Sequence, residues 1–537
     1  MKIVNFIKNK WVAISLAFIM LLAASLFFFK LNEAPPCLNA DEASFAYNAY
    51  SILKTGRDEY GEFMPLRLKA FGDNRFPLIT YLDVPWVALF GLNETSARMA
   101  NFPFVILFPI VLYFLTLELF KNKYAAVFSS LFVTLSVGLQ SIGRQTHEAY
   151  LTVFFLTLAS YFFVKFLNKK RPIDFYLFII IFFIDLFGYH PTRLWAIFFF
   201  AVIFFLAYTK ILKWKHLLIF TAAVCLFAVT DFVYKPTRVS NLLFFNTDGF
   251  KSKVYEYQIE GGLSFLYNKL TVGIKDVSLE YVKYFSPQFL AINGDDNYRF
   301  GYPGMYPVTP VEYVLLLVGL YYLFRNREKW RFLILALLLF SPSSAILSWA
   351  GASLTRSLFI LIPVSIIAAY GLSQIFKQKK LIFIAVMGLY LIMALYNWDF
   401  LLYHFPKRLV TIHAWQCGYK ELGDYVKTNY DRFDKFYITK KNGQPYIFLL
   451  LYLNYPPEKY QKSAHLTSPD EYGFGQVEGF DKFVFSLDNI DTSLDHAVIG
   501  FPDDFSSDLS QEEIDKIKKI QVRTEHMFWI KETSKTP

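Results

Sequence analysis

The sequence predicts an α-helical polytopic membrane protein with a small extracytoplasmic α/β domain at its carboxy-terminal end. Composition is the first observation behind this prediction. Of 537 residues, 55% are hydrophobic and 20% aromatic, and the mean hydropathy is +0.33. Only 18% are charged, against roughly 25% in a typical soluble protein. These figures exclude a disordered chain, a collagen-like repeat and a soluble cytosolic enzyme.

Long apolar runs are the second observation, because ~20 apolar residues suffice to cross a bilayer as a helix. About eleven transmembrane helices are therefore expected. The runs lie near residues 11–29, 97–119, 124–142, 149–167, 173–189, 194–209, 216–233, 311–324, 332–350, 357–373 and 381–398. The stretch 77–91 is apolar but short, and it contains Asp83 and Pro85. We expect it to form a re-entrant or interfacial helix, since one more span would invert the charge pattern of every later loop.

The distribution of charge is the third observation. The formal net charge is +10, and 19 basic residues gather in alternate loops together with only three acidic residues. Such an imbalance between the two sides is what the positive-inside rule describes. It places the amino terminus in the cytoplasm and the carboxy-terminal tail on the outer side. The basic balance is thus a topology signal, and nucleic acid is not an expected partner.

From about residue 399 the composition changes, and residues 399–537 are predicted to form the extracytoplasmic α/β domain. Strands are expected at 435–439, 482–486, 496–500 and 527–530, and helices at 417–430, 444–453 and 510–518. Ser510 and Glu513 have the spacing of a capping box. The helix at 444–453 is apolar enough for either a domain core or a membrane contact. There is no nucleotide-binding loop, so no chemistry is assigned to this domain.

Three cysteines are too few for a disulfide framework or a zinc site of the CxxC type. Cys37 and Cys417 both fall on the outer side, where a bridge between them is chemically possible but is not fixed by the sequence. Cys225 falls in the middle of an apolar run and is expected to be a small core residue.

The first outer loop holds the best candidate for chemistry. Asp41 and Glu42 open a stretch with apolar residues at helical spacing. Asp41 as a helix N-cap, with Glu42 as a favourable first-turn charge, is one interpretation. The other is that two adjacent carboxylates at the membrane edge supply a general base or a metal site.

Polar residues also collect in the other outer loops, whereas the inner loops contain plain Lys/Arg clusters. These polar residues are Arg144, His147 and Glu148 after the third span, Tyr189, His190 and Arg193 after the fifth, and Arg356 after the ninth. Asp185, just inside the membrane, is expected to pair with Arg144 or Arg193 or to serve the site. A transporter would place such groups nearer the midplane. Their position at the outer interface favours binding of a lipid-linked phosphate.

Several segments together resemble the GT-C superfamily of polyprenyl-phosphate-sugar glycosyltransferases, close to bacterial protein O-mannosyltransferases and aminoarabinose transferases. The resemblance covers about residues 1–430 and depends on the order and spacing of the motifs. They are Asp41-Glu42, residues 74–81 (NRFPLITY), residues 90–98 (FGLNETSAR), Arg144 with Glu148, residues 189–193 (YHPTR), residues 284–287 (YFSP), Gly294-Asp295, and Thr355-Arg356-Ser357. It implies a GT-C catalytic domain at 1–398, whose outer loops 31–95 and 234–309 carry active-site elements. The second of these loops is expected to be ordered by turns and to contact the acceptor.

The resemblance implies an inverting transfer of a hexosyl or pentosyl group from a polyprenyl-phosphate donor to an acceptor hydroxyl, with Asp41 as general base. Arg75 falls where the family has a basic residue that contacts phosphate, although it is Arg rather than Lys and is followed by Phe76 where Pro is usual. The implied catalytic set is Asp41, Glu42 and Glu148. The implied substrate-binding set is Arg75, Tyr81, Arg144, His147, Tyr189, His190, Arg193 and Arg356.

No metal is expected to be required, and Asp41, Glu148 and His190 are the expected ligands if a divalent ion binds. The expected partners are the lipid-linked donor, a protein, lipid or glycan acceptor, and membrane lipids, in a plasma (inner) membrane. Other functions stay open: an oligosaccharide ligase or polymerase that uses a diphosphate-linked donor, a solute transporter, or a non-catalytic scaffold for envelope assembly.

Overall fold

The computed structural model describes residues 2–71, 73–234, 243–348, 351–468, 476–505 and 510–534. Its contacts divide the chain into two compact units. We call Met1–Leu31 with Asn101–Phe405 the membrane unit, and Asn32–Ala100 with Pro406–Pro537 the composite unit. The sequence placed one boundary near residue 398, with the first outer loop in the transmembrane domain. The structure instead groups that loop with the carboxy-terminal domain, for the packing reason given below.

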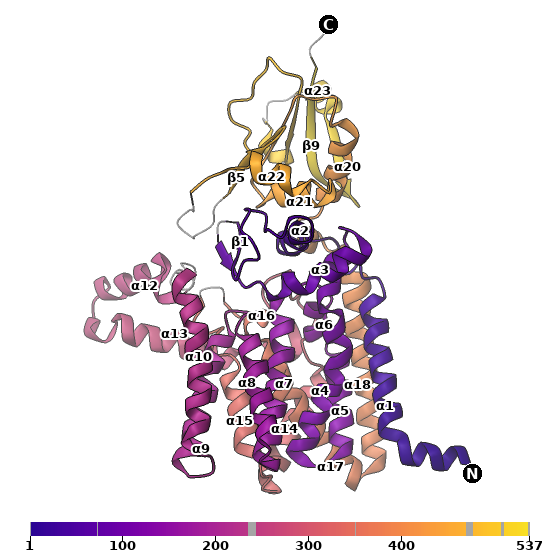
Figure 1. Ribbon diagram of the computed structural model, residues 1–537, viewed down its shortest axis with the longest axis vertical. Coiled ribbons are helices and arrows are strands. Elements are labelled where there is room, and N and C mark those ends of the chain that lie inside the picture. Colours follow the sequence, from indigo (N-terminus) through magenta and orange to yellow (C-terminus); the bar gives the residue numbers. More distant parts are fainter. Residues whose placement is uncertain are drawn as a thin grey trace. The chain divides into compact units, whose positions relative to one another are not determined.

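Each predicted span overlaps a helix of the membrane unit, but the span at 124–142 is divided between two helices, and the one at 332–350 is helical only as far as Phe340 (Figure 1). The helices are α1 (Lys2–Phe28), α4 (Phe102–Phe120), α5 (Lys123–Leu135), α6 (Val137–Gly143), α7 (Glu148–Lys169), α8 (Pro172–Asp185), α9 (Thr192–Tyr208), α10 (Trp214–Tyr234), α14 (Pro310–Arg325), α15 (Arg331–Phe340), α16 (Leu354–Ser357), α17 (Leu361–Gln378) and α18 (Lys380–Asp399). By length and composition, five helical segments of the described chain can cross a membrane alone. A sixth is formed if α5 and α6, which are bent by 58°, count as one span.

Close helix packing in the membrane unit uses small residues, as is usual between membrane helices. Helix α14 packs against α17, where a Cβ on Gly319 would lie 2.0 Å from the carbonyl oxygen of Ile367. At this crossing only glycine fits. The prediction for Cys225 is wrong, because its side chain is exposed on α10. Exposure at mid-span means that this thiol faces lipid.

The segment between α10 and α14 contains more helix than expected. It includes α12 (Asp248–Ile259) and α13 (Lys269–Lys283), followed by a short helical turn at Gln288–Asn293. Thr247 caps α12, and Asn268 forms a capping box with Thr271 at the start of α13. These caps and an amphipathic pattern were present in the sequence, so the helices could have been predicted there.

The carboxy-terminal part of the composite unit is the expected α/β domain. Its seven-stranded sheet has the order β4-β5-β6-β3-β7-β9-β8, with β3 parallel to both β6 and β7. The strands are β3 (Lys435–Ile438), β4 (His465–Leu466), β5 (Val477–Phe480), β6 (Phe483–Val484), β7 (His496–Gly500), β8 (Lys518–Val522) and β9 (Glu525–Thr533). The helices are α19 (Leu409–Ala414), α20 (Tyr419–Asn429), α21 (Pro445–Tyr452), α22 (Pro457–Ser463) and α23 (Gln511–Lys516). Ser510 and Glu513 form the predicted capping box of α23.

The first outer loop supplies α2 (Ala40–Thr55), β1 (Leu68–Ala70), β2 (Asp73–Arg75) and α3 (Leu78–Phe90) to the same unit. Helix α2 packs against α3, α21 and α22, and its fully buried Ala43 and Ala46 share one hydrophobic core with α21. The segment 444–453 was expected to be either domain core or a membrane contact, and the structure shows that it belongs to the domain core. A disulfide joins Cys37 to Cys417, whose Cα atoms lie 5.6 Å apart. Loop and domain are therefore one folded body.

Candidate active site

Asn39 is the residue that caps α2. Its side-chain oxygen accepts hydrogen bonds from the backbone N–H of Asp41 at 2.9 Å and of Glu42 at 3.1 Å. The interpretation of Asp41 as the N-cap is therefore wrong, because Asn39 precedes it and satisfies the free N–H groups of the first turn. The carboxylate of Asp41 is therefore not needed to cap the helix.

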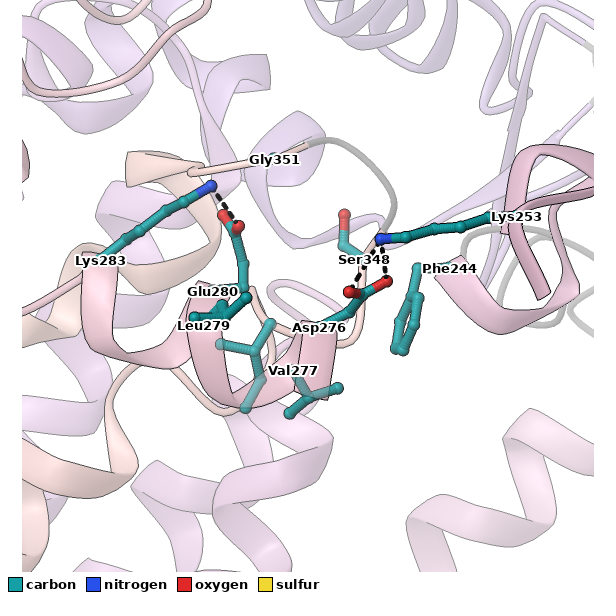
Figure 2. A pocket seen from close by; sticks show the side chains of 10 residues that line it. Phe244, Lys253, Asp276, Val277, Leu279, Glu280, Lys283, Ser348 and Gly351 are labelled. Carbon is teal, nitrogen blue, oxygen red and sulfur yellow. Dashed lines mark hydrogen bonds and ion pairs between the residues drawn. The ribbon is translucent and has the colours of Figure 1, made fainter. Parts of the chain in front are cut away.

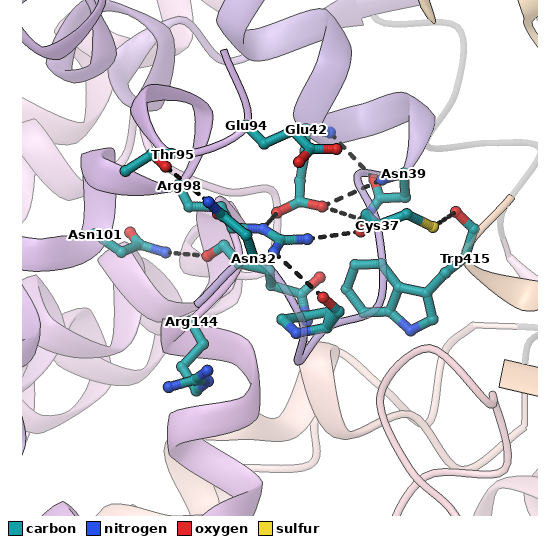
Figure 3. Close-up of polar contacts among 12 residues, drawn as sticks. Asn32, Cys37, Asn39, Glu42, Glu94, Thr95, Arg98, Asn101, Arg144 and Trp415 are labelled. Carbon is teal, nitrogen blue, oxygen red and sulfur yellow. Dashed lines mark hydrogen bonds and ion pairs between the residues drawn. The ribbon is translucent and has the colours of Figure 1, made fainter. Parts of the chain in front are cut away.

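Glu42 is fully buried, at 0% exposure, and its two carboxylate oxygens are both bound (Figure 3). One oxygen accepts from the backbone N–H and side-chain amide of Asn39, each at 3.2 Å. The other accepts from Nε of Arg98 at 3.3 Å. The same guanidinium donates to the carbonyl oxygens of Pro35, at 3.3 Å, and Cys37, at 2.6 Å. Glu42 thus has a structural role, because its bonds to Asn39 and Arg98 hold the loop before α2. Its catalytic role stays a prediction.

Asp41 and Arg75 form an ion pair that is partly open to solvent. Nη2 of Arg75 lies 2.7 Å from Oδ1 of Asp41, and the two side chains are 10% and 39% exposed, respectively. Arg75 ends β2 opposite Leu68 of β1, and its guanidinium lies 4.9 Å from the ring centre of Phe71. The ring of Phe71 and the β1–β2 strand pair hold the guanidinium of Arg75 in place, whereas the carboxylate of Asp41 remains accessible to a substrate.

Tyr81 makes a contact within the same loop. Its hydroxyl, carried by α3, donates to the carbonyl oxygen of Pro65 at 2.9 Å. This hydrogen bond ties α3 to the chain that leads into β1, so Tyr81 supports the strand pair that carries Arg75. Direct substrate binding by Tyr81 stays a prediction.

A buried carboxyl pair, Asp58 and Glu59, lies in the same unit and was not singled out by sequence reasoning. Burial raises the pKa of Glu59 to about 8, and the charge of Asp58 adds to that rise. Hydrogen bonding to Asn48 and the charge of Arg75 oppose it. Charge interaction with Arg75 shows that Glu59 belongs to the surroundings of the Asp41–Arg75 pair. At neutral pH its carboxyl is therefore protonated.

We expect the stability of the composite unit to fall as the pH rises from about 5 to 8. Because the pKa of Glu59 is higher in the folded state than in the unfolded state, its stabilising proton is fully bound below the usual pKa and is lost as the pH rises through about 8. One such group removes about 1.4 kcal/mol of unfolding free energy per pH unit within that window. Thermal unfolding of wild type and Glu59→Gln across the range measures this slope. A variant that retained the wild-type slope would exclude Glu59 as its source.

In the membrane unit, the structure brings His147 and Tyr189 together. Nδ1 of His147 accepts from the backbone N–H of Ala149 at 3.0 Å, so this histidine caps α7. Its ring meets the rings of Tyr189 and Phe300 edge-on, with centroids 5.8 Å and 5.4 Å away. Glu148 is the first residue of α7, where a negative charge is favoured by the helix dipole. The aromatic contacts thus fix the start of α7 and with it the position of Glu148.

Arg144 binds the carboxy-terminal end of α1. Its buried guanidinium donates to the carbonyl oxygens of Leu26, of Phe27 at 2.9 Å, of Phe29 at 2.8 Å and of Lys30 at 3.0 Å. The last carbonyls of a helix have no partner inside the helix, so Arg144 satisfies them. These contacts give Arg144 a structural role, and substrate binding by Arg144 stays a prediction.

His190 and Arg193 lie in the tight turn that starts α9. The backbone N–H of Thr192 donates to the carbonyl of Tyr189 at 3.1 Å, and that of Arg193 donates to the carbonyl of His190 at 3.2 Å. Both predicted residues are half-buried. The turn thus joins the backbones of His190 and Arg193, and the roles of their side chains in binding stay predictions.

Arg356, on the short helix α16, is positioned by groups that the sequence did not assign to the site. The buried Asp295 accepts from the backbone N–H of Leu354 at 2.6 Å, and burial raises the pKa of Asp295 to about 6. The hydroxyl of Tyr284 accepts from the backbone N–H of Ser353 at 2.9 Å. Asp295 stands in a run of Gly, Asp and Asn that indicated a turn, but its target is 59 residues away and has no local signal.

A cavity of about 330 Å³ lies between α13 and the segment before α16 (Figure 2). One of its lining residues, Ser348, accepts a hydrogen bond from the guanidinium of Arg356. The lining residues are Phe244, Lys253, Asp276, Val277, Leu279, Glu280, Lys283, Ile346, Ser348 and Gly351. Aromatic, acidic and basic side chains thus line one cavity, next to Arg356, which is predicted to bind the donor phosphate.

Metal binding finds no ready site in the described part of the chain, where no group of three or more His, Cys, Asp or Glu side chains could hold an ion. The candidate ligands Asp41, Glu148 and His190 are divided between the two units, with Asp41 in the composite unit.

Comparison with known proteins identifies the relatives of this chain. Residues 74–234 match the family model of dolichyl-phosphate-mannose-protein mannosyltransferases. ArnT from Cupriavidus metallidurans, solved bound to undecaprenyl phosphate, is similar over 97% of this chain and 98% of its own, with 11% identity and a TM-score of 0.53. Its apo structure gives 12% identity, the same coverage and a TM-score of 0.52.

The archaeal oligosaccharyltransferase AglB from Archaeoglobus fulgidus, solved with an inhibitory peptide and a dolichol-phosphate, is similar over 83% of this chain at 13% identity and a TM-score of 0.48. The chain spans only 64% of the length of AglB. No curated protein matches the sequence. The resemblance found in the sequence is thus confirmed: residues 74–234 are similar to the mannosyltransferase family model, and the chain as a whole has the fold of the GT-C membrane glycosyltransferases.

Proposed function

We propose that the protein is an inverting glycosyltransferase that moves a sugar from a polyprenyl-phosphate donor to an acceptor hydroxyl. The observation that carries this proposal is the accessible Asp41 carboxylate 2.7 Å from the guanidinium of Arg75. A general base and a fixed cation next to each other are the two groups that this displacement needs.

In the proposed reaction, Asp41 accepts a proton and Arg75 stabilises the leaving group. The acceptor oxygen attacks the anomeric carbon and loses its proton to Asp41. The bond from the anomeric carbon to the phosphate oxygen breaks, and the lipid phosphate leaves with the electron pair. Arg75 stabilises the negative charge that develops on this leaving group, for which a planar guanidinium is well suited. A single in-line displacement inverts the anomeric centre.

We place the reaction on the extracytoplasmic face of an inner membrane. The composite unit contains the Cys37–Cys417 disulfide, and disulfides persist in oxidising compartments rather than in the cytosol. The clustering of basic residues in alternate loops independently assigns the opposite face to the cytoplasm. The amino terminus is then cytoplasmic.

Purified protein tests this proposal with three donor classes: a polyprenyl-phosphate sugar, a polyprenyl-diphosphate glycan and a nucleotide sugar. Asp41→Asn, prepared in parallel, reports any contaminating transferase. Transfer from the monophosphate donor alone, with an inverted anomeric configuration in the product, is the expected result. Transfer only from the diphosphate donor would assign the protein as a ligase or polymerase. A folded protein that used none of the three would refute the enzyme assignment.

A further inference from the structure

The helical hairpin formed by α12 and α13 has very little core of its own. Only Phe250, Val254 and Val272 form its buried cluster, with Phe244 and Tyr257 packed against them. An ion pair between Lys253 and Asp276, 2.8 Å long, joins the two helices (Figure 2). The hairpin therefore holds together as a piece, but most of its residues are exposed.

Large apolar side chains cover the outside of this hairpin. Phe265 is 71% exposed and Leu270 is 70% exposed. Soluble surfaces show single exposed apolar residues, whereas a contiguous group marks an interaction site. The exposed set is Tyr255, Ile259, Leu263, Phe265, Leu266, Tyr267, Leu270, Ile274, Leu279 and Val282.

The base of the hairpin is fixed to the rest of the membrane unit. The hydroxyl of Tyr281 donates to the carbonyl of Leu339 at 2.8 Å, and the backbone N–H of Phe244 donates to the carbonyl of Leu347 at 3.2 Å. Its tip is different, since every residue from 261 to 270 except Ser264 is exposed. A fixed base and a bare apolar tip mean that the tip projects from the bundle.

The direction of the hairpin matches that of a helix pair lying on a membrane. Figure 1 shows α12 and α13 running across the direction of the bundle helices, beside the end of α10. Helix α10 exposes Leu226, Val229 and Phe232 on the approach to that end, and these side chains face lipid in a membrane-spanning protein. The hairpin and the end of α10 beside it thus both expose apolar side chains.

We propose that the α12–α13 hairpin is an interfacial anchor, with Phe265, Leu266 and Leu270 inserted below the head groups of the leaflet at which α10 ends. Amphipathic helices that lie in the membrane plane bury an apolar face of this kind to the head-group and acyl boundary. A convex tip exposed on all sides suits a fluid, deformable partner, whereas a rigid protein partner requires a shaped surface. The inference is independent of the transfer reaction.

Depth-sensitive labelling tests the anchor directly in the intact protein. A Cys225→Ala background removes the thiol outside the disulfide, and single cysteines at Phe265, Leu270 and Ser252 then carry an environment-sensitive fluorophore. Ser252 is exposed on the same hairpin between two lysines and is the matched control. The samples are reconstituted in nanodiscs, and quenching is measured with a nitroxide attached near the head of the acyl chain and with aqueous iodide.

Labels at 265 and 270 should be quenched by the lipid nitroxide at least about threefold more than the label at 252, with the order reversed for iodide. Equal behaviour at all three positions would show that the hairpin stands in water and would overturn the proposal. Protection of 265 and 270 from both quenchers would also overturn it, in favour of a protein partner or a second copy. Because the tip side chains are not packed, these substitutions should leave the fold intact, which the unfolding temperature checks.

Discussion

Replacing Asp41 with asparagine should lower the turnover of sugar transfer by at least ~100-fold, the lower end of the usual contribution of a general base. Asparagine has nearly the same shape and can still accept a hydrogen bond from Arg75, but it cannot take up the proton of the acceptor. Turnover should therefore fall while donor affinity, measured separately by lipid-phosphate binding, changes little. Transfer at saturating donor and acceptor, by both proteins in matched detergent, measures the effect.

The structure shows why this substitution should not unfold the protein. Asn39 caps α2 and Glu42 completes the capping box, so the helix start does not depend on Asp41. The ion pair with Arg75 is partly exposed and is expected to contribute at most about 1 kcal/mol. Asp424→Asn, an exposed carboxylate of α20 in the same unit, is the matched control and should keep full activity. Equal turnover in wild type and Asp41→Asn would remove Asp41 from the mechanism and shift the test to Glu148.

Replacing Arg98 with methionine should destabilise the composite unit by about 3–5 kcal/mol, the usual result of leaving one partner of a buried ion pair unpaired. Glu42 would then keep a charge at a site with no solvent access. Asp83 is also buried, and burial together with the charge of Glu42 holds the pKa of Asp83 well above its usual range.

A double variant separates the buried charge from the loss of packing. Arg98→Met combined with Glu42→Gln removes both charges and should recover most of the lost stability, because a neutral pair needs no compensation in the core. Thermal unfolding followed by tryptophan fluorescence measures both proteins, and Trp415 in the core of this unit contributes to the signal. A double variant as unstable as the single one would show that packing of the guanidinium, rather than its charge, holds the loop.

Local patterns predicted the positions of the helices well, because apolar runs and caps act over a few residues. The cap of α23 at Ser510 and the strands β3, β6, β7 and β9 follow from such signals, whereas β4, β5 and β8 were not predicted. The roles of Glu42 and Arg144 could not be predicted in this way. Each depends on a partner far along the chain: Arg98 lies 56 residues from Glu42, and the carbonyl of Phe27 lies 117 residues from Arg144.

In the candidate site, too, the sequence indicated the residues but not the long-range packing that supports them. The family motifs drew attention to Asp41 and Arg75, and their ion pair agrees with a shared task. The support around them is long-range, since α2 packs on α21, nearly 400 residues later, and no periodicity in either segment encodes that pairing. A charged residue in an outer loop looks the same in the sequence whether it binds a substrate or the end of a helix.

The composition of the composite unit also constrains how the protein is made. Residues 32–100 leave the ribosome early, but the helices and strands against which they pack belong to the last quarter of the chain. The unit that carries Asp41 therefore stays incomplete while the spans of the membrane unit are being inserted. Its disulfide closes across 380 residues and can form only once Cys417 has been synthesised. A chain that stops after α18 would therefore contain the helices of the membrane unit but would lack the partners against which residues 32–100 fold.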